Sequence, residues 1–388
     1  MNKLLIFLLL NIFSPISFAA EAGRKPAGKE EIVQTKKLSA VEQLSHLENL
    51  PWEKIFEIID HAVDPLITEI QTKEQNILSK LSEAEKSYTE EKQLETFISH
   101  QQLKPIYEMI TKLVDFRSNF LATSKKLSQA QSYIDTKIVK AIRKINQRIK
   151  NNLLGFAIFD DNESAISLLI QAGANLNALI VSPIGKYSIG TGENVRYSDI
   201  LTYPLSWAVI RGSIPMAQLL IKKGAKVPTA KPGESLDILR NLVYLAAANN
   251  KLEMQKFLLD TLRLRADTSI ILGITPLHIA ANENFLDMVK LLLQHKTMAD
   301  PKDNYNKTPL VLAALSGNKD IVELLLSNGA DPNIKSSISF GAGLTSYTQN
   351  LIGALLKFID FSPEISKDPA KKQNYMEIIN LLREYRDK

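Results

Sequence analysis

A regular pattern of hydrophobic and polar positions marks the second half of the chain. Residues 273–281 read G-I-T-P-L-H-I-A-A and residues 306–314 read N-K-T-P-L-V-L-A-A, with their threonines 33 positions apart. Each phrase is followed by an apolar stretch that contains L-L-L, at residues 291–293 and 324–326. This spacing predicts two short helices in each copy. Such a pair cannot bury its apolar side alone, so we expect the copies to stack.

The residues that flank these helices have the chemistry of helix ends. Thr275 suits the position before a helix, where its hydroxyl accepts a hydrogen bond from a backbone N–H. Pro276 suits the first helical position, where a missing N–H costs nothing. Gly329 suits a left-handed C-terminal cap. These features predict where each helix begins and ends.

The T-P-L-H-I-A-A phrase, the 33-residue period and the G-A-D-P-N ending at residues 329–333 resemble ankyrin repeats. The resemblance implies helix–turn–helix units that are joined by a loop or β-turn finger and stacked into a curved solenoid. It also implies that His278 forms structural hydrogen bonds near the start of its helix. The residues expected to maintain the repeat structure are Thr275, Pro276, Leu277, His278, Thr308, Pro309, Leu310, Gly173, Gly224 and Gly329.

Weaker copies of the pattern extend the predicted repeat domain over residues 151–388. We expect about six repeats, near residues 152–180, 203–230, 241–265, 275–303, 308–336 and 350–388. Departures from the pattern are expected at the ends, because terminal repeats need a polar outer face. Residues 178–201 form an insertion rich in Gly, Ser and Tyr. We expect a disordered or merely tolerated loop there, with a contact to a partner as the alternative.

Residues 38–150 have a helical pattern of a different kind. Apolar residues recur at steps of three and four, as in Trp52, Ile55, Phe56 and Ile59, and no glycine occurs between Glu30 and Leu154. This pattern predicts an α-helical bundle or a long antiparallel helical hairpin. The expected fold class is therefore all-α, an ankyrin-repeat solenoid preceded by a coiled-coil-like helical domain.

Charge is divided between the two halves of this helical segment. Residues 41–100 carry 5 basic and 13 acidic side chains, whereas residues 101–150 carry 11 basic and 3 acidic ones. Opposite charges favour antiparallel pairing of the two halves, at roughly 0.2–0.5 kcal/mol per surface pair. As an alternative, the cations of residues 137–150 lie on one predicted helix whose other face is a stripe of isoleucines from Ile134 to Ile149. Such a helix also suits weak contact with a membrane surface or an acidic partner.

Composition excludes several classes of function. The 388 residues include no cysteine, which excludes disulfides, thiolate zinc sites and cysteine nucleophiles. The net charge of +5 is too small over this length to indicate nucleic-acid binding. The five histidines lack H-E-x-x-H or another short metal spacing, and the chain has neither a P-loop nor a G-x-S-x-G phrase. We therefore expect no catalytic, cofactor-binding or metal-binding residues, and no enzyme activity.

The first twenty residues have the pattern of a secretory signal peptide. Lys3 precedes an apolar run from Leu4 to Phe13, and small residues follow near Ala19. The run is shorter than the roughly 20 residues that cross a bilayer. We expect residues 1–20 to be a cleaved signal and residues 21–37 to be a flexible linker. The mature protein is then expected in a bacterial periplasm or outside the cell.

The resemblance to ankyrin repeats implies a non-enzymatic module that binds a protein partner on a concave surface. Positions that vary in the family correspond here to one finger and to the ends of the first helices. The candidate partner-binding residues are Ile210, Arg211, Asn249, Asn282, Glu283, Asn304, Tyr305, Lys307, Leu315 and Ser316. Tyr305 and Arg211 are the strongest of them, because Tyr and Arg dominate interface hot spots. The alternative is an envelope scaffold whose helical segment oligomerises or contacts a membrane.

Overall fold

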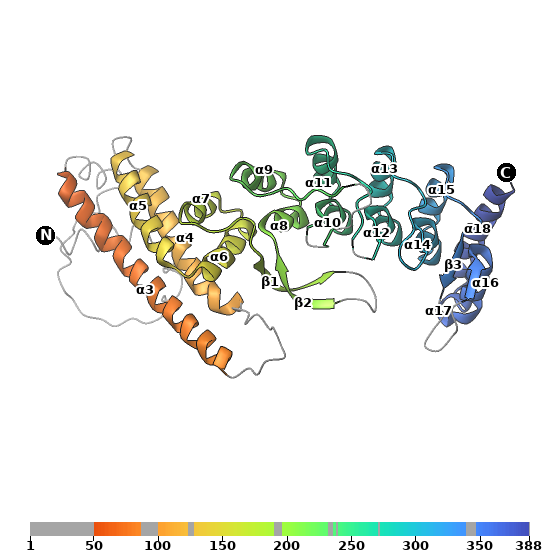
Figure 1. Ribbon diagram of the computed structural model, residues 1–388, viewed down its shortest axis with the longest axis horizontal. Coiled ribbons are helices and arrows are strands. Elements are labelled where there is room, and N and C mark those ends of the chain that lie inside the picture. The colour runs from red at the N-terminus through yellow and green to blue at the C-terminus, as the bar shows by residue number, and fades with distance from the viewer. Residues whose placement is uncertain are drawn as a thin grey trace, which may run out of the picture. The chain divides into compact units, whose positions relative to one another are not determined.

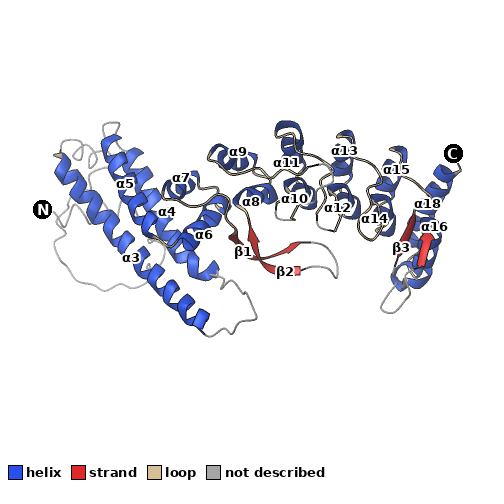
Figure 2. Ribbon diagram, in the orientation of Figure 1, coloured by secondary structure: helices blue, strands red, loops and turns tan. Residues whose placement is uncertain are grey.

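Helices build most of the chain (Figure 2). The chain divides into two compact units. The computed structural model describes residues 50–86, 100–122, 128–189, 196–231, 236–237, 240–270, 272–338 and 347–387. The predicted signal peptide and linker lie outside these residues. The first unit contains residues 1–187 with 198–201, and the second contains residues 188–197 with 202–388. The predicted all-α class is confirmed for the main elements.

Three long helices form the core of the first unit. They are α3 (Trp52–Lys86), α4 (His100–Ala122) and α5 (Ser128–Lys144), which run in alternating directions and pack pairwise (Figure 1). Ile59, Ile110 and Ile138 are completely buried, one from each helix. The hydrophobic stripes that predicted a helical bundle therefore face one another.

The isoleucine stripe of α5 continues into a second helix. After α5 ends, α6 (Gln147–Phe159) begins behind Asn146, whose side chain accepts a hydrogen bond from the backbone N of Arg148 at 2.9 Å. The buried carboxylate of Glu74, on α3, accepts a hydrogen bond from the backbone N of Asn146 at 2.6 Å. The single helix expected from Ile134 to Ile149 is thus divided in two, because a side chain from a distant helix fixes the turn.

The first predicted repeat packs against this bundle. Its helices α6 and α7 (Glu163–Gln171) contact α4, and α7 also contacts α5. The Nζ of Lys150, a buried residue of α6, donates to the backbone O of Arg143 at 3.2 Å and of Ala172 at 3.1 Å. Burial lowers the pKa of Lys150, and the charge of Arg143 adds to the effect. The domain boundary predicted at residue 150 stays a prediction, whereas the compact unit observed here extends through α7.

The second unit contains two rows of short helices (Figure 1). The first row is α8 (Pro204–Arg211), α10 (Leu242–Ala248), α12 (Pro276–Asn282) and α14 (Pro309–Leu315). The second row is α9 (Ile214–Lys222), α11 (Leu252–Lys256) with the π-helix η3 (Phe257–Thr261), α13 (Leu286–Gln294) and α15 (Lys319–Ser327). Within the first row, α10 packs on α8 and α12, and α12 packs on α14. Each pair lies at a position where a repeat was expected.

Helix starts in this stack follow the predicted capping chemistry. The hydroxyls of Thr275 and Thr308 accept hydrogen bonds from the backbone N of His278 and Val311, each at 3.4 Å. Proline follows each threonine at the first helical position. Each of these two helices also contains a pair of fully buried alanines, whose small side chains let neighbouring first-row helices pack closely. The alanines are Ala280, Ala281, Ala313 and Ala314.

The predicted C-terminal caps have the backbone that glycine permits. Gly173, Gly224 and Gly329 have φ of +94°, +104° and +89°, and a Cβ added at any of them would meet nothing within 4 Å. Glycine is therefore required there for its conformation and not for space.

Two short sheets accompany the helices. The strands β1 (Ile180–Ile189) and β2 (Arg196–Thr202) pair with each other. They occupy the insertion that we expected to be a loop, so that expectation is corrected: backbone hydrogen bonds between two segments of the insertion order the part described here. The strands β3 (Lys335–Ile338) and β4 (Tyr347–Asn350) pair antiparallel, with Lys335 opposite Asn350.

The stack ends in three helices, α16 (Leu351–Phe361), α17 (Pro363–Ser366) and α18 (Pro369–Arg386). The last helix packs on both α15 and α16. Tyr375 of α18 donates from its hydroxyl to the backbone O of Leu315 at 2.8 Å, and Asn374 donates to the backbone O of Gly317 at 2.8 Å. These bonds close the terminal end of the first-row helix α14.

One core position of the stack holds an amide where its neighbours hold valine. Gln255 is fully buried, and no described group bonds to its Nε2 or Oε1. Val289 and Val322 fill the corresponding positions of α13 and α15, also fully buried. An unsatisfied buried polar group costs about 1–3 kcal/mol. We infer that this amide weakens the packing of α11.

Gln255→Met is expected to raise the free energy of unfolding by about 1–2 kcal/mol, because it removes the unsatisfied amide and keeps an unbranched side chain. Urea denaturation followed by circular dichroism measures the change. Gln255→Glu is the matched control and is expected to lower stability. A loss of stability in the Met variant would show that the amide has a partner, such as an internal water.

Candidate functional site

One buried carboxylate closes the finger between α13 and α14. Asp303 accepts hydrogen bonds on Oδ1 from the backbone N of Tyr305 at 2.9 Å and from that of Lys307 at 2.8 Å. The backbone N of Asp303 in turn donates to the backbone O of Lys307 at 3.0 Å. These bonds fix the finger tip, and Tyr305 is 59% exposed on it.

The neighbouring finger presents Leu272 at the position equivalent to Tyr305, 33 residues earlier. Leu272 is 43% exposed, and its backbone O accepts a hydrogen bond from the backbone N of Asn304 at 3.0 Å. Gly273 allows this approach, because a Cβ there would lie 3.0 Å from Oδ1 of Asn304. Sequence reasoning missed Leu272, although the 33-residue offset from Tyr305 points to it. We call Leu272, Asn304 and Tyr305 the finger surface.

His278 joins the finger to the start of α12. Its Nδ1 accepts a hydrogen bond from the backbone N of Thr275 at 3.1 Å, and its Nε2 lies 3.1 Å from the backbone O of Lys307. The two contacts define a neutral ring with the proton on Nε2. Burial lowers the pKa of His278, against smaller opposing contributions from the backbone O of Lys307 and from Asp303. His278 therefore has the structural place that the resemblance implied.

The stack is expected to lose stability in mild acid through His278. The pKa of this ring is lowered from its ordinary value of 6.5 in the folded chain. The unfolded chain therefore takes up the proton first, and stability falls as the pH drops below about 6.5 toward the folded value. Urea denaturation at several pH values between about 7 and about 5 measures the slope.

His278→Gln is expected to flatten that slope, since it removes the titrating group. His295→Gln is the matched control, because His295 is only half-buried and lies near Asp260, with 3.4 Å between Nε2 and Oδ1. An unchanged slope in His278→Gln would assign the acid sensitivity to other groups.

The predicted residues at the helix ends form a polar row. Ser316 donates from Oγ to Oδ1 of Asn282 at 3.1 Å, and Asn282 donates from Nδ2 to Oε1 of Glu283 at 2.8 Å. Asn249 is half-buried and donates to the backbone O of Leu245 at 2.8 Å. The row therefore links the ends of α12 and α14 through side chains that are already oriented.

The two predicted residues at the end of α8 differ in access. Arg211 is exposed. Ile210 is 7% exposed, so its assignment as a contact residue is corrected: its side chain belongs to the core of the stack. Leu315 is half-buried, and its backbone O accepts the hydrogen bond from Tyr375. Lys307 is also half-buried, and the contacts described here involve its backbone.

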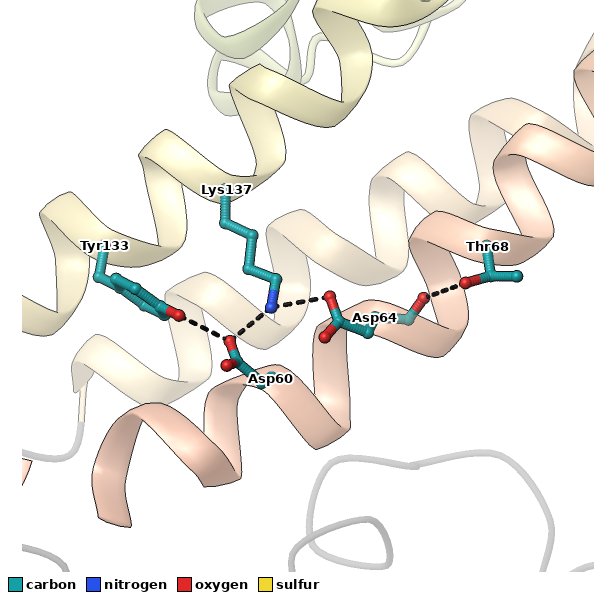
Figure 3. A network of polar contacts seen from close by, with 5 residues as sticks. All are labelled: Asp60, Asp64, Thr68, Tyr133 and Lys137. Carbon is teal, nitrogen blue, oxygen red and sulfur yellow. Dashed lines mark hydrogen bonds and ion pairs between the residues drawn. The ribbon is translucent and has the colours of Figure 1, made fainter. Parts of the chain in front are cut away.

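Part of the predicted basic surface of residues 137–150 is used inside the first unit. Lys137 lies between α3 and α5, paired with Asp60 and with Asp64, the latter at 2.7 Å (Figure 3). Tyr133 donates to Asp60 at 2.8 Å, and Thr68 donates to the backbone O of Asp64 at 2.9 Å. Partial burial lowers the pKa of Lys137, but the bonds to the two carboxylates outweigh it and the net shift is upward.

Lys150 is also used inside the first unit, where it donates hydrogen bonds to the backbone oxygens described above. Three other cations of this segment are exposed: Lys140, Arg143 and Lys144. The isoleucine stripe is not available for insertion into a membrane. Ile134, Ile138, Ile142 and Ile149 are completely buried. Any contact made by this segment therefore depends on its charges.

Two further kinds of feature are absent from the described ranges. No group of three or more His, Asp or Glu side chains in these ranges is arranged to hold a metal ion. No helix in the same ranges combines the length and the hydrophobicity that crossing a bilayer requires.

Comparison with known proteins identifies the repeats. A family model described as ankyrin repeats, in three copies, matches residues 242–336, from α10 to β3. Of the helices that we expected to form repeats, α6 to α9 and α16 to α18 lie outside that range, so their assignment to repeats stays a prediction.

Several relatives share the same pattern over part of their length. The ankyrin repeat and KH domain-containing protein mask-1 of Caenorhabditis elegans is 28% identical over 203 residues, which cover 46% of this chain and 8% of that protein. Serine/threonine-protein kinase 12 of Arabidopsis thaliana is 37% identical over 98 residues, 25% of this chain and 21% of the kinase. A putative ankyrin repeat protein of Rickettsia bellii (strain RML369-C) is 27% identical over 140 residues, 36% of this chain and 52% of that protein. The chain spans about half or less of each.

Proposed function

We propose that this chain, an ankyrin repeat protein, binds a protein partner through the finger surface and the polar row of helix ends. The repeats imply a protein-interaction module. The proposal adds where the partner binds: on the finger surface, with exposed Arg211 and the polar row at the helix ends, which consists of Asn249, Asn282, Glu283 and Ser316.

One observation carries the proposal most directly. Two large apolar side chains, Leu272 and Tyr305, are exposed at equivalent positions of neighbouring fingers that a backbone hydrogen bond joins. Asp303 and the backbone hydrogen bond from Asn304 to Leu272 fix the backbone beneath them, so little conformational freedom is lost when a partner binds. Such preorganisation favours affinity, and an aromatic side chain with a polar tip suits the centre of an interface.

The proposed role is binding without catalysis. Ankyrin repeats generally serve as interaction modules, and the match to the Arabidopsis kinase covers only 21% of that protein. Its kinase activity is therefore no guide to this chain. The polar row supplies hydrogen-bonding groups that orient a partner at the edge of the apolar contact.

Affinity capture tests the proposal. Mature wild-type protein and a Leu272→Asp/Tyr305→Asp variant serve as baits in the same lysate. We expect a partner that the wild type retains and the variant loses. Phe361→Asp is the control, since Phe361 is 61% exposed, similar to Tyr305, but is the last residue of α16 and belongs to neither finger. Equal capture by all three baits would contradict binding at the finger surface.

We also propose that the protein works after export from the cytosol. The support is the signal-like pattern of residues 1–20, which lie outside the described part of the chain. Amino-terminal sequencing of the protein from the periplasm or culture medium tests this proposal. We expect the mature chain to start at residue 20 or 21. Protein that retains Met1 and remains in the cytosol would contradict it.

An acidic partner for the basic segment is favoured over a membrane surface. The isoleucine face that would enter a membrane is buried, whereas exposed cations remain on the other face of α5.

A further inference from the structure

We infer that a groove along α5, in the first unit, is a second binding site and takes an acidic segment of a protein. The groove has a volume of about 640 Å³. It is lined by Gln131, Ser132, Asp135, Thr136, Val139, Lys140, Arg143 and Gln171. All but Gln171, the last residue of α7, belong to α5.

The groove follows one face of the helix. Ser132, Thr136, Val139 and Arg143 stand four, three and four residues apart, the spacing that places side chains on a single stripe. At about 1.5 Å per residue, the stripe is about 16 Å long. An extended peptide of about five residues spans that length. The shape therefore suits a short stretch of polypeptide better than a single small anion.

The two ends of the groove differ in chemistry. Gln131, Ser132 and Thr136 supply uncharged amides and hydroxyls at one end. Lys140 and Arg143 supply cations at the other end, where Nη2 of Arg143 also donates to the backbone O of Gln171 at 3.4 Å. A ligand that fits has its carboxylates at the α7 end and polar groups at the other.

The charge of the groove is left positive. Asp135 is the one acidic residue of its lining, and Arg117 of α4 holds it through two contacts, one of them 3.1 Å between Nη2 and Oδ2. Within the described residues, no carboxylate pairs with Lys140 or Arg143. Adjacent Lys137 pairs with both Asp60 and Asp64, and these three groups together carry one negative charge. The positive charge of the groove therefore comes from Lys140 and Arg143 alone.

Other occupants fit less well. An anionic membrane would be bound by an amphipathic helix through its apolar face, but the isoleucines of α5 are packed inside. Nucleic-acid sites commonly make about 6–10 phosphate contacts, far more than two cations one helical turn apart provide. The charge and the length of the groove together point to an acidic peptide.

This site is independent of the proposed finger surface, because its residues belong to the other unit. The probe is a fluorescein-labelled peptide of about six residues with alternating glutamate and serine, titrated with the full chain at about 50 mM salt and followed by anisotropy. A peptide with glutamine in place of glutamate is the neutral control. We expect binding of the acidic peptide, and weaker binding at about 200 mM salt.

Two kinds of variant locate the binding. Lys140→Glu/Arg143→Glu is expected to weaken it at least about tenfold. Lys144→Glu/Arg148→Glu changes the net charge equally but lies outside the groove lining, and is expected to weaken binding less than about threefold. Thr136→Trp fills the groove without changing charge, and is also expected to weaken binding at least about tenfold. Circular dichroism confirms that each variant is folded.

Several results would overturn the inference. They are equal losses in the two charge-reversal variants, unchanged binding in Thr136→Trp, or equal binding of the neutral peptide. Binding to vesicles of phosphatidylserine and phosphatidylcholine that matches or exceeds peptide binding, and is lost in both charge variants alike, would assign the surface to a membrane. Tyr305→Ala is expected to leave peptide binding unchanged, so failure at one site is distinguishable from failure at the other.

Discussion

Leu272→Ala combined with Tyr305→Ala is expected to weaken binding of the captured partner by about 2–3 kcal/mol, a loss of roughly 30- to 150-fold. The physical reason is the loss of two exposed apolar side chains held on adjacent rigid fingers. Isothermal titration calorimetry with purified partner measures the affinity. Each single variant is expected to lose about half of this free energy or more, since hot-spot contributions do not add.

Phe361→Ala provides the reference for nonspecific loss, because Phe361 is as exposed as Tyr305 but lies on α16. It is expected to change the affinity by less than about 0.5 kcal/mol. If the double variant loses no more than this reference, the partner does not contact the fingers and the proposed surface is wrong.

Asp303→Ala is expected to lower the free energy of unfolding by about 2–4 kcal/mol, because two backbone N–H groups lose a buried charged acceptor. The finger that carries Tyr305 then loses its fixed conformation, so partner binding is also expected to weaken. Chemical denaturation gives the first quantity, and calorimetry gives the second. Both changes originate at one carboxylate oxygen, which bonds to Tyr305 and Lys307.

Two further variants separate the causes. Asp303→Asn keeps an acceptor oxygen without the charge and is expected to lose about half as much stability. Asp267→Ala, on the preceding finger, removes an exposed carboxylate paired with Arg265 at 2.6 Å and is expected to cost less than about 1 kcal/mol. Equal costs for the alanine variants at 303 and 267 would mean that Asp303 does not hold the finger.

The part of the fold that the sequence predicted well is the part with local signals. Thr275 and Thr308, each followed by proline, mark helix starts that depend only on adjacent residues. Glycine at position 329 marks a helix end for the same reason. These local features predict α12 to α15 without information about long-range contacts.

The features that were missed depend on contacts between distant residues. Nothing near Asn146 indicates that Glu74, on another helix, bonds to its backbone and fixes the break between α5 and α6. The apolar run around Leu272 has the composition of a buried strand, and only its alignment with Tyr305 shows that it lies on a finger tip. Ile210 occupies a position that varies in the family, but its apolar side chain is buried in the core.

The candidate surfaces likewise differ in whether they depend on local sequence or on contacts between distant residues. Tyr305 and Asn304 could be predicted because the repeat period aligns them with finger positions of the family. The cations of the groove on α5 belong to the basic segment that the sequence indicated, but the groove itself could not be predicted, since Gln171 at the end of α7 forms part of its lining. Its positive charge depends on Arg117, a residue of α4 that neutralises Asp135 from outside the groove.

The packing of α6 and α7 on the long helices limits where repeats can be gained or lost during the evolution of this chain. Tandem duplication or loss of a repeat alters a stack least where each unit touches only its neighbours. The pair α6–α7 does not meet that condition, because the ammonium group of Lys150 secures it to the end of α5. Gene rearrangements that lengthen or shorten this protein should therefore fall downstream of residue 202, and lineages that lack the amino-terminal helices should also lack the first pair.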